Sequence, residues 1–305
     1  MLRDICNFAK RLRHADPFTF GLLEYKGILQ DRKAASTSHS DASSPLNFSF
    51  VFRLPATHAS VQSLRGRLLS RNAHDSLSER FALAQQLVRA VAYVHIYRFV
   101  HKNVRPENIL LLRRGEKGML GNIGPGTGKE GSELLETAAL VGFDVLRDAE
   151  GGTHRLGDDD WEKNLYRHPS RQGRTPEVDY EMRHDIYSLG VCLLEIGLWQ
   201  SFIGDGAAAR NSNTIGEVLE CSDETEVMLF KDPSQVAERL LRVARVKLRR
   251  RMGTKYGKVV ETCLTCLDEG NEDFGNEEEF QDGDGVAVGV RYIEKVVAKL
   301  GEIAV

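Results

Sequence analysis

The run of residues 186–199, IYSLGVCLLEIGLW, constrains the fold more than any other part of the sequence. It is nearly all apolar and predicts, with the residues before it, a helix over 182–199. A helix that is apolar on every side is buried within a larger domain. We therefore expect other helices to surround it, and helical periodicity predicts them at residues 77–96, 233–251, 255–267 and 290–303.

Strand signals are concentrated in the first part of the chain. Residues 2–14 predict a short helix, and the runs 18–29 and 47–54, rich in Phe, Leu, Val and Tyr, predict strands. The polar Ser/Ala tract between them, residues 31–45, is expected to be a floppy hairpin insertion. A small strand-bearing part followed by a larger helical part predicts an α+β fold.

Composition excludes several classes of protein. The formal net charge of −3 argues against a dedicated nucleic-acid binder, and no apolar run reaches the length of a membrane span. Five cysteines, an odd and sparse count, suit a reducing compartment rather than a disulfide framework. We therefore predict a cytoplasmic protein with no membrane span.

The segment from His101 to Leu111, HKNVRPENILL, resembles the catalytic loop of protein kinases, H-R-D-L-x-x-x-N. Three further motifs follow in the family's order: VGFD at 141–144 stands at the place of Asp-Phe-Gly, YRHPS at 166–170 resembles the end of an activation segment, and DIYSLGVCLLEIG at 185–197 resembles the helix that anchors the loop. The resemblance implies a protein-kinase-like fold, with residues 1–55 as a partial N-lobe and residues 56–305 as a helical C-lobe.

The N-terminal side departs most from the family. A complete kinase has a Gly-rich loop and a strand Lys paired with a helix Glu, and no G-x-G-x-x-G precedes the catalytic-loop motif here. If residues 2–14 correspond to the end of that Glu-bearing helix, the three strands that precede it in the N-lobe of a kinase are absent. In an alternative alignment Lys26 is the nucleotide Lys, but no Glu-bearing helix follows it.

The catalytic-loop residues themselves are altered. Asn103 stands at the position of the catalytic Asp, and an amide cannot act as a general base, a role worth about 10²–10⁴ in rate. Arg105 stands where many kinases have a Lys that meets the transferred phosphate, so a phosphate contact remains open. Asn108 matches a magnesium ligand, but a lone neutral ligand holds Mg²⁺ poorly. We expect Asn103 to bond the loop backbone and Asn108 to close a local turn.

Gly142 replaces the magnesium Asp of the family and supplies no ligand atom. Asp144 lies two positions later, about 6–7 Å along an extended chain, so it could serve only after a local rearrangement. Phe143 keeps its place and is expected to pack in the core. We predict no metal site.

Other positions speak for a preserved scaffold. Asp185 matches the family's Asp that bonds the catalytic-loop backbone, and with His101 it predicts that the loop keeps its shape. Ser170 replaces the Glu that the family pairs with an Arg of a later helix. No Arg is present in the corresponding segment, ETCLTCLDEGNEDF, so both halves of that ion pair are missing together, which avoids a costly unpaired buried charge.

Several other patterns are assigned no function. The Gly-rich stretch GNIGPGTGKEG fails the phosphate-loop pattern twice and is expected to be a flexible insertion. Cys263 and Cys266 form a single C-x-x-C and are expected to be buried thiols rather than zinc ligands. The basic run 242–251 could meet acidic partners or phosphoinositides, although a solvated helix face is the simpler interpretation. The acidic run 268–284 lacks the spacing of a Ca²⁺ loop.

Three hypotheses follow. The first is a pseudokinase that binds protein partners in signalling and needs no cofactor; eroded loops of this kind resemble those of kinase-like domains in fungal multidomain proteins. The second is a weak or atypical Ser/Thr protein kinase that uses ATP and Mg²⁺ through displaced residues. The third is a fragment that does not fold alone, because lost strands would expose an edge and apolar surface. Oligomeric state stays open.

Overall fold

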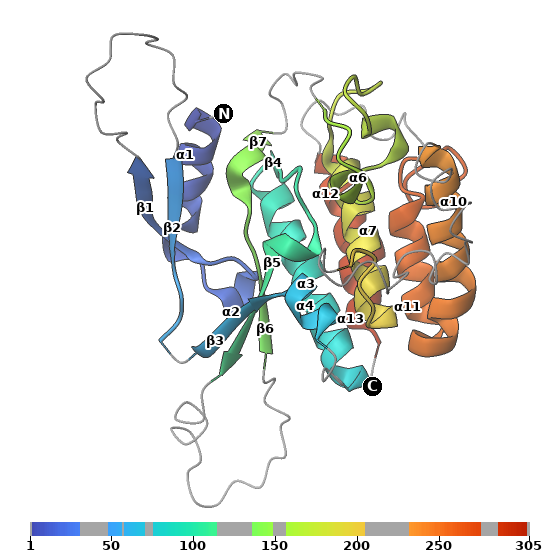
Figure 1. The fold of residues 1–305 in the computed structure, drawn as a ribbon, viewed down its shortest axis with the longest axis horizontal. Coiled ribbons are helices and arrows are strands. Elements are labelled where there is room, and N and C mark those ends of the chain that lie inside the picture. Colours follow the sequence, from blue (N-terminus) through green and yellow to red (C-terminus); the bar gives the residue numbers. More distant parts are fainter. Residues whose placement is uncertain are drawn as a thin grey trace, which may run out of the picture.

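The structure, a computed structural model, places an α+β chain with strands on one side and helices on the other (Figure 1). The residues that it describes are 2–30, 48–56, 58–70, 76–114, 136–148, 157–204, 232–275 and 286–303. The polar tract 31–45, the Gly-rich stretch 121–131, Cys221 and the end of the acidic run lie outside these ranges. The predicted fold class is confirmed.

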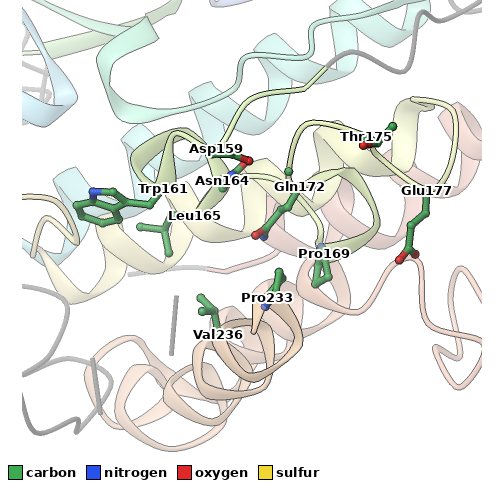
Figure 2. Close-up of a pocket in the computed structure, with 11 residues that line it drawn as sticks. Asp159, Trp161, Asn164, Leu165, Pro169, Gln172, Thr175, Glu177, Pro233 and Val236 are labelled. Atoms are coloured by element: carbon green, nitrogen blue, oxygen red, sulfur yellow. The ribbon is translucent and has the colours of Figure 1, made fainter. Parts of the chain in front are cut away.

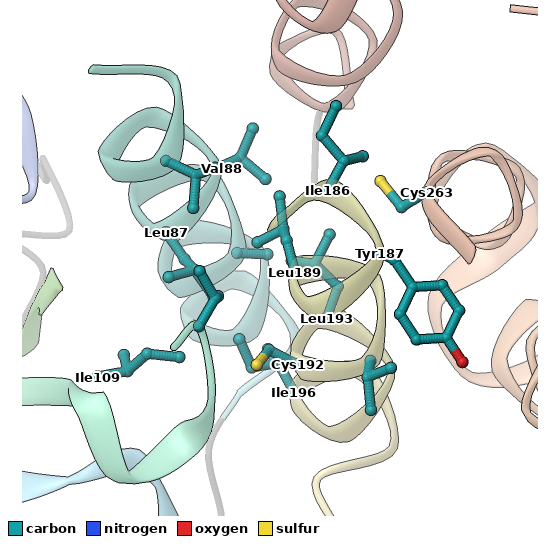
Figure 3. Close-up of a cluster of buried hydrophobic side chains, with 14 of the residues drawn as sticks. Leu87, Val88, Ile109, Ile186, Tyr187, Leu189, Cys192, Leu193, Ile196 and Cys263 are labelled. Carbon is teal, nitrogen blue, oxygen red and sulfur yellow. The ribbon is translucent and has the colours of Figure 1, made fainter. Parts of the chain in front are cut away.

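Helix α7 (Met182–Leu198) forms the centre of the helical part, and every one of its residues is buried. It packs between α4 (Leu77–Ile96) and α11 (Arg249–Leu264), as Figure 3 shows. Gly190 permits the close approach of α11, because a Cβ there would lie 2.9 Å from that of Cys263. The predicted buried central helix is confirmed.

Helix α4 begins where the sequence predicts. The Ser76 side chain accepts a bond from the Glu79 N–H (3.2 Å), and the Glu79 carboxylate accepts one from the Ser76 N–H (2.7 Å). This reciprocal capping box satisfies two N–H groups that the helix itself cannot. The inner face of α4 then lies against α7 and strand β6 (Glu136–Leu140).

The remaining helical segments complete this part of the molecule. They are α10 (Pro233–Val243), η6 (Ala244–Leu248), α12 (Val286–Tyr292), η8 (Ile293–Ala298) and α13 (Lys299–Gly301). The backbone leaves helical geometry at Gly253, where φ is 83°, which agrees with the predicted break between 251 and 255. The last predicted helix begins earlier than expected, at Val286.

Within the described residues, the strands form three small sheets. One pairs β1 (Glu24–Gln30) with β2 (Phe48–Arg53), a second has the order β3 (His58–Ser63), β5 (Ile109–Arg114), β6 (Glu136–Leu140), and a third pairs β4 (Phe99–Val100) with β7 (Arg147–Asp148). Every paired strand is antiparallel. The chain also has short helical elements, which are η1 (Leu12–His14), α2 (Pro17–Phe20), α3 (Leu64–Leu69), η2 (Pro106–Asn108), η4 (Phe143–Val145), α6 (Trp161–Asn164) and η5 (Pro169–Arg171).

The N-terminal prediction needs two corrections. The predicted strand 18–29 starts only at Glu24, because Asp16 caps a short helix, α2, by accepting bonds from the Phe18 and Thr19 N–H groups. Strand β3 and helix α3 were not predicted, since only Ala59 and Val61 are apolar in the strand HASVQS, which forms by pairing with β5. The predicted helix over 2–14 is confirmed as α1 (Leu2–Arg11) followed by η1.

Helix α1 is attached to the rest of the molecule through an aromatic contact. Phe8 is buried, and its ring lies 5.1 Å from that of Phe99 and 4.9 Å from that of Phe143. Burying a Phe side chain contributes about 1.5–3 kcal/mol. This contact brings the first helix onto the segment that contains the altered motifs. Among the described helices, none has the length and apolarity needed to cross a membrane.

Candidate functional site

Asp185, at the start of α7, organises the loop that contains His101. Its carboxylate accepts bonds from the N–H groups of His101 (2.7 Å) and Lys102 (2.8 Å) and from the Tyr180 hydroxyl (2.7 Å). His95 Nε2 lies 3.2 Å away. The two loop bonds hold Lys102 in the left-handed region, at φ 66°, which a residue with a side chain seldom adopts.

The charge on Asp185 is stabilised by these neighbours. Burial by itself would raise the pKa of Asp185, since the carboxylate has no solvent exposure. The hydrogen bonds from His95 and from the Tyr180 hydroxyl, together with the electrostatic attraction of the His95 and His101 rings, outweigh burial and hold the pKa of Asp185 below its ordinary value. A buried carboxylate that accepts several hydrogen bonds from the backbone fixes the conformation of that backbone.

His101 joins this loop to the segment that contains Gly142. Its Nε2 lies 3.0 Å from the Val141 carbonyl oxygen, and its Nδ1 accepts a bond from the Asn103 N–H (3.2 Å). These partners assign the neutral tautomer with the proton on Nε2. The Phe143 ring lies edge-on to the imidazole at 4.9 Å. The structure thus brings His101, Phe143 and Asp185 into one assembly.

Asn108 uses its side chain within the loop. Its Nδ2 donates to the Asn103 carbonyl (2.8 Å), its N–H donates to the Arg105 carbonyl (2.9 Å), and its carbonyl accepts from the Val141 N–H (2.8 Å). These bonds close the turn η2 and fasten it to the segment before Gly142. The geometry favours a turn-closing role for Asn108 over that of a free ligand.

The backbone at Gly142 is left-handed (φ 84°), and its Cα faces the Asn108 amide. A Cβ at this position would lie 2.6 Å from Asn108 Oδ1 and 2.7 Å from Nδ2, closer than real Cβ contacts. No side chain therefore fits at residue 142 while Asn108 keeps its bond to Asn103. The backbone of Asp144 is in η4, but its side chain lies outside the described part of the structure.

Two basic residues proposed for phosphate contact lie in different settings. Arg105 is partly buried, and its Nε atom is enclosed without a hydrogen-bond partner in the described structure. Lys26, the alternative nucleotide Lys, lies on β1 and forms an ion pair with Glu24 of the same strand. No three His, Cys, Asp or Glu side chains gather closely enough to hold a metal ion among the residues with described positions.

The structure also reveals a buried ionic network that the sequence analysis missed. Arg65 of α3 donates to Glu107 (3.1 Å) and Glu195 (3.0 Å) and also bonds the hydroxyls of Tyr166 and Ser201. The Tyr166 hydroxyl donates in turn to Glu195 (2.9 Å). The network joins α3, η2 and α7. The available signal was Glu195, the one charged residue between Ile186 and Leu198, because a buried carboxylate requires a partner.

The network carries opposing electrostatic effects. Burial raises the pKa of Glu195 to about 7, although the Arg65 charge and the bonds from Phe202 and Tyr166 act in the other direction. Burial by itself would lower the pKa of Arg65, but Glu195, Tyr166 and Glu107 together raise it above its ordinary value. Arg65 therefore stays charged, and the pair is stable only while both partners are present.

Neutral hydrogen bonds surround Ser170, which stands where the motif of protein kinases has a Glu. Ser170 Oγ lies 2.8 Å from His168 Nδ1 and 3.5 Å from His184 Nε2, and His184 Nδ1 accepts a bond from the Glu181 N–H (3.0 Å). Burial, followed by the charge of Arg183, lowers the pKa of His168 to about 4, and burial lowers that of His184 to about 3. A chain of neutral hydrogen bonds thus surrounds Ser170, where the kinase resemblance has the Glu of an ion pair.

Cys263 and Cys266 are both buried, as predicted, and Cys266 Sγ donates to the Arg183 carbonyl at 3.1 Å.

A cavity of about 380 Å³ lies between the segment with Trp161 and α10 (Figure 2). Trp161, Leu165, Pro169, Pro233 and Val236 form its apolar wall. Polar and acidic groups complete the lining with Asp159, Asn164, Gln172, Gly173, Thr175 and Glu177. Pro169 of this lining belongs to the segment that resembles the end of an activation segment.

Comparison with known proteins finds kinases. A stretch of 120 residues is 30% identical to eukaryotic translation initiation factor 2-alpha kinase 1 of Rattus norvegicus and 31% identical to that of Mus musculus. The match covers 37% of this chain and 16% of each relative. The chain is similar to protein kinases over this stretch, which supports a protein-kinase-like fold.

Two other comparisons add little. No family model matches the chain. The crystal structure of the yeast RNA Pol II CTD kinase CTDK-1 complex aligns with 85% of this chain and 74% of that one, at 15% identity and a TM-score of 0.46. A TM-score of this size is too low to serve as evidence of a shared fold.

Proposed function

We propose that this chain is a protein-kinase-like domain that does not catalyse phosphoryl transfer and acts as a scaffold or regulatory binding module in signalling. The observation that carries the proposal is the packing of the Asn108 amide against Gly142. At this position, where the resemblance expects a magnesium carboxylate, there is no side chain, and none fits while the Asn108 amide keeps its bond to the Asn103 carbonyl. Asn103 in place of the catalytic Asp adds a second loss, because an amide cannot accept the acceptor's proton.

The proposal extends to the rest of the domain. Residues 1–55 form a partial N-lobe and residues 56–305 a helical C-lobe, and the domain is of the degenerate kind found in fungal proteins. His101, Phe143 and Asp185 keep a structural role. Asn103, Arg105 and Gly142 stand at positions that are catalytic in kinases, and they do not serve catalysis here. The protein acts in the cytoplasm on protein partners, without nucleic acid, metal or nucleotide.

Nucleotide binding tests this proposal. A ligand that binds only the folded state stabilises it by about 2.7 kcal/mol at a concentration of 100 Kd, so thermal unfolding with ATP and Mg²⁺ is a sensitive assay. We expect no shift in Tm for the wild type. Asn108→Ala serves as the matched variant, since it removes the candidate ligand that remains in the loop.

The opposite result would favour the second hypothesis, an atypical ATP-dependent Ser/Thr kinase. A magnesium-dependent rise in Tm that Asn108→Ala removes, together with phosphotransfer that Asp144→Ala abolishes, would overturn the proposal. A soluble chain that unfolds cooperatively in the same experiment would exclude the third hypothesis, a fragment that does not fold alone.

A further inference from the structure

The charge of this chain is strongly segregated. Between Arg239 and Lys258 the sequence has nine Lys or Arg residues and no Asp or Glu. Since the whole chain has a formal net charge of −3, the remaining residues carry −12. The basic segment spans the end of α10, η6 and the first part of α11, on the side of the helical part away from the β-sheets (Figure 1).

Carboxylates of the chain neutralise only part of this segment. Glu261 pairs with Arg245 (2.7 Å) and Arg249 (2.5 Å), and Glu238 pairs with Arg242 at 3.6 Å. A second set of cations is exposed and forms no ion pair within the described structure. This basic patch consists of Arg250, Arg251, Lys255 and Lys258. It lies on both sides of the backbone break at Gly253, which is itself exposed.

The surroundings of the basic patch limit the size of its partner. On one side it borders a cavity of about 560 Å³ whose lining includes Lys258, Asp268 and Asp273. The residues outside 239–258 carry a formal charge of −12, so the chain as a whole disfavours contact with an extended polyanion. A short acidic segment can contact the cations alone, whereas a bilayer or a nucleic-acid duplex is large enough to contact more of the negatively charged chain.

We infer that the basic patch binds a short acidic segment of a partner protein. Carboxylate side chains suit it, because the chain's own Glu261 already shows how two neighbouring arginines of this surface hold one carboxylate. The patch is apart from the loop that contains Asn108, so the inference goes beyond the proposed function, and either one can fail without the other.

Fluorescence anisotropy with a short, labelled peptide of alternating Glu and Ser tests the inference. The patch variant is Arg250→Glu/Lys255→Glu/Lys258→Glu; Arg251 is left intact because its guanidinium also bonds the Leu198 carbonyl. The control variant, Lys10→Glu/Arg13→Glu/Arg89→Glu, makes the same change in net charge at exposed residues elsewhere. Far-UV circular dichroism establishes that both variants are folded.

The wild type should bind the peptide, and binding should weaken steeply with salt, since the Debye length is about 10 Å at 0.1 M. The Kd of the patch variant should be higher by about tenfold, because several exposed ion pairs with the peptide are lost. The control variant should bind as the wild type does. Equal weakening by both variants, or no weakening by the patch variant, would refute the inference. Binding of phosphatidylserine vesicles or a short DNA duplex in place of the peptide would also overturn it, since the partner would then be another class of molecule.

Discussion

The contact between Gly142 and Asn108 predicts a measurable coupling between the two residues. In Gly142→Ala the new methyl group meets Asn108 Oδ1 and Nδ2 at 2.6 and 2.7 Å, so the Asn108 amide must move and release the Asn103 carbonyl. Losing that hydrogen bond costs about 1 kcal/mol. The left-handed backbone adds roughly 1–2 kcal/mol for any residue with a Cβ. We therefore expect Gly142→Ala to lower the free energy of unfolding by about 2–3 kcal/mol.

A double-mutant cycle separates these two contributions. Asn108→Ala alone should cost about 1 kcal/mol for the lost bond. In that background the methyl group at residue 142 finds space, so only the backbone cost of roughly 1–2 kcal/mol remains. The coupling between the two substitutions should be about 1 kcal/mol, within the range found for residues in contact.

Gly173 provides a matched control for the backbone effect. Its φ is also positive, at 75°, but a Cβ there would have no atom within 4 Å. Gly173→Ala should therefore cost only the roughly 1–2 kcal/mol of the left-handed backbone. Urea unfolding followed by circular dichroism measures all four variants. The reasoning is wrong if Gly142→Ala costs no more than Gly173→Ala, or if the costs of Gly142→Ala and Asn108→Ala simply add.

Three further predictions concern buried charges and histidines. Asp185→Ala should lower the free energy of unfolding by about 3–5 kcal/mol, because buried N–H groups of the loop lose their acceptor; a cost below 1 kcal/mol in urea unfolding would contradict this role. Arg65→Met should cost a similar amount by leaving Glu195 unpaired, and Arg65→Met/Glu195→Leu should recover part of it; equal stability of the single and double variants would count against the network. Since the folded pKa values of His168 and His184, about 4 and about 3, lie below 6.5, stability should fall as pH drops from 6.5 towards 4. His184→Gln should reduce that slope by about 1.4 kcal/mol per pH unit, and an unchanged slope in urea titrations at several pH values would refute the assignment.

The sequence was sufficient where local signals agree with burial. The apolar run in α7 predicts a buried helix whatever surrounds it, and Ser76 with Glu79 predicts the start of α4, because a capping box depends on residues within one turn. The motif around His101 and Asp185 also predicts which residues lie together, since their spacing resembles that of a known loop.

Tertiary structure decided what local signals cannot specify. Strand β3 is polar and exists through its pairing with β5, and Arg65 meets Glu195, 130 residues away, only because the fold brings α3 within reach of α7. The sequence shows that a carboxylate is missing at Gly142, but only the fold places the Asn108 amide against that residue. Neighbouring residues determine caps and local hydrogen bonds, so the sequence predicts them. The space around a residue depends on segments that meet only after the chain has folded.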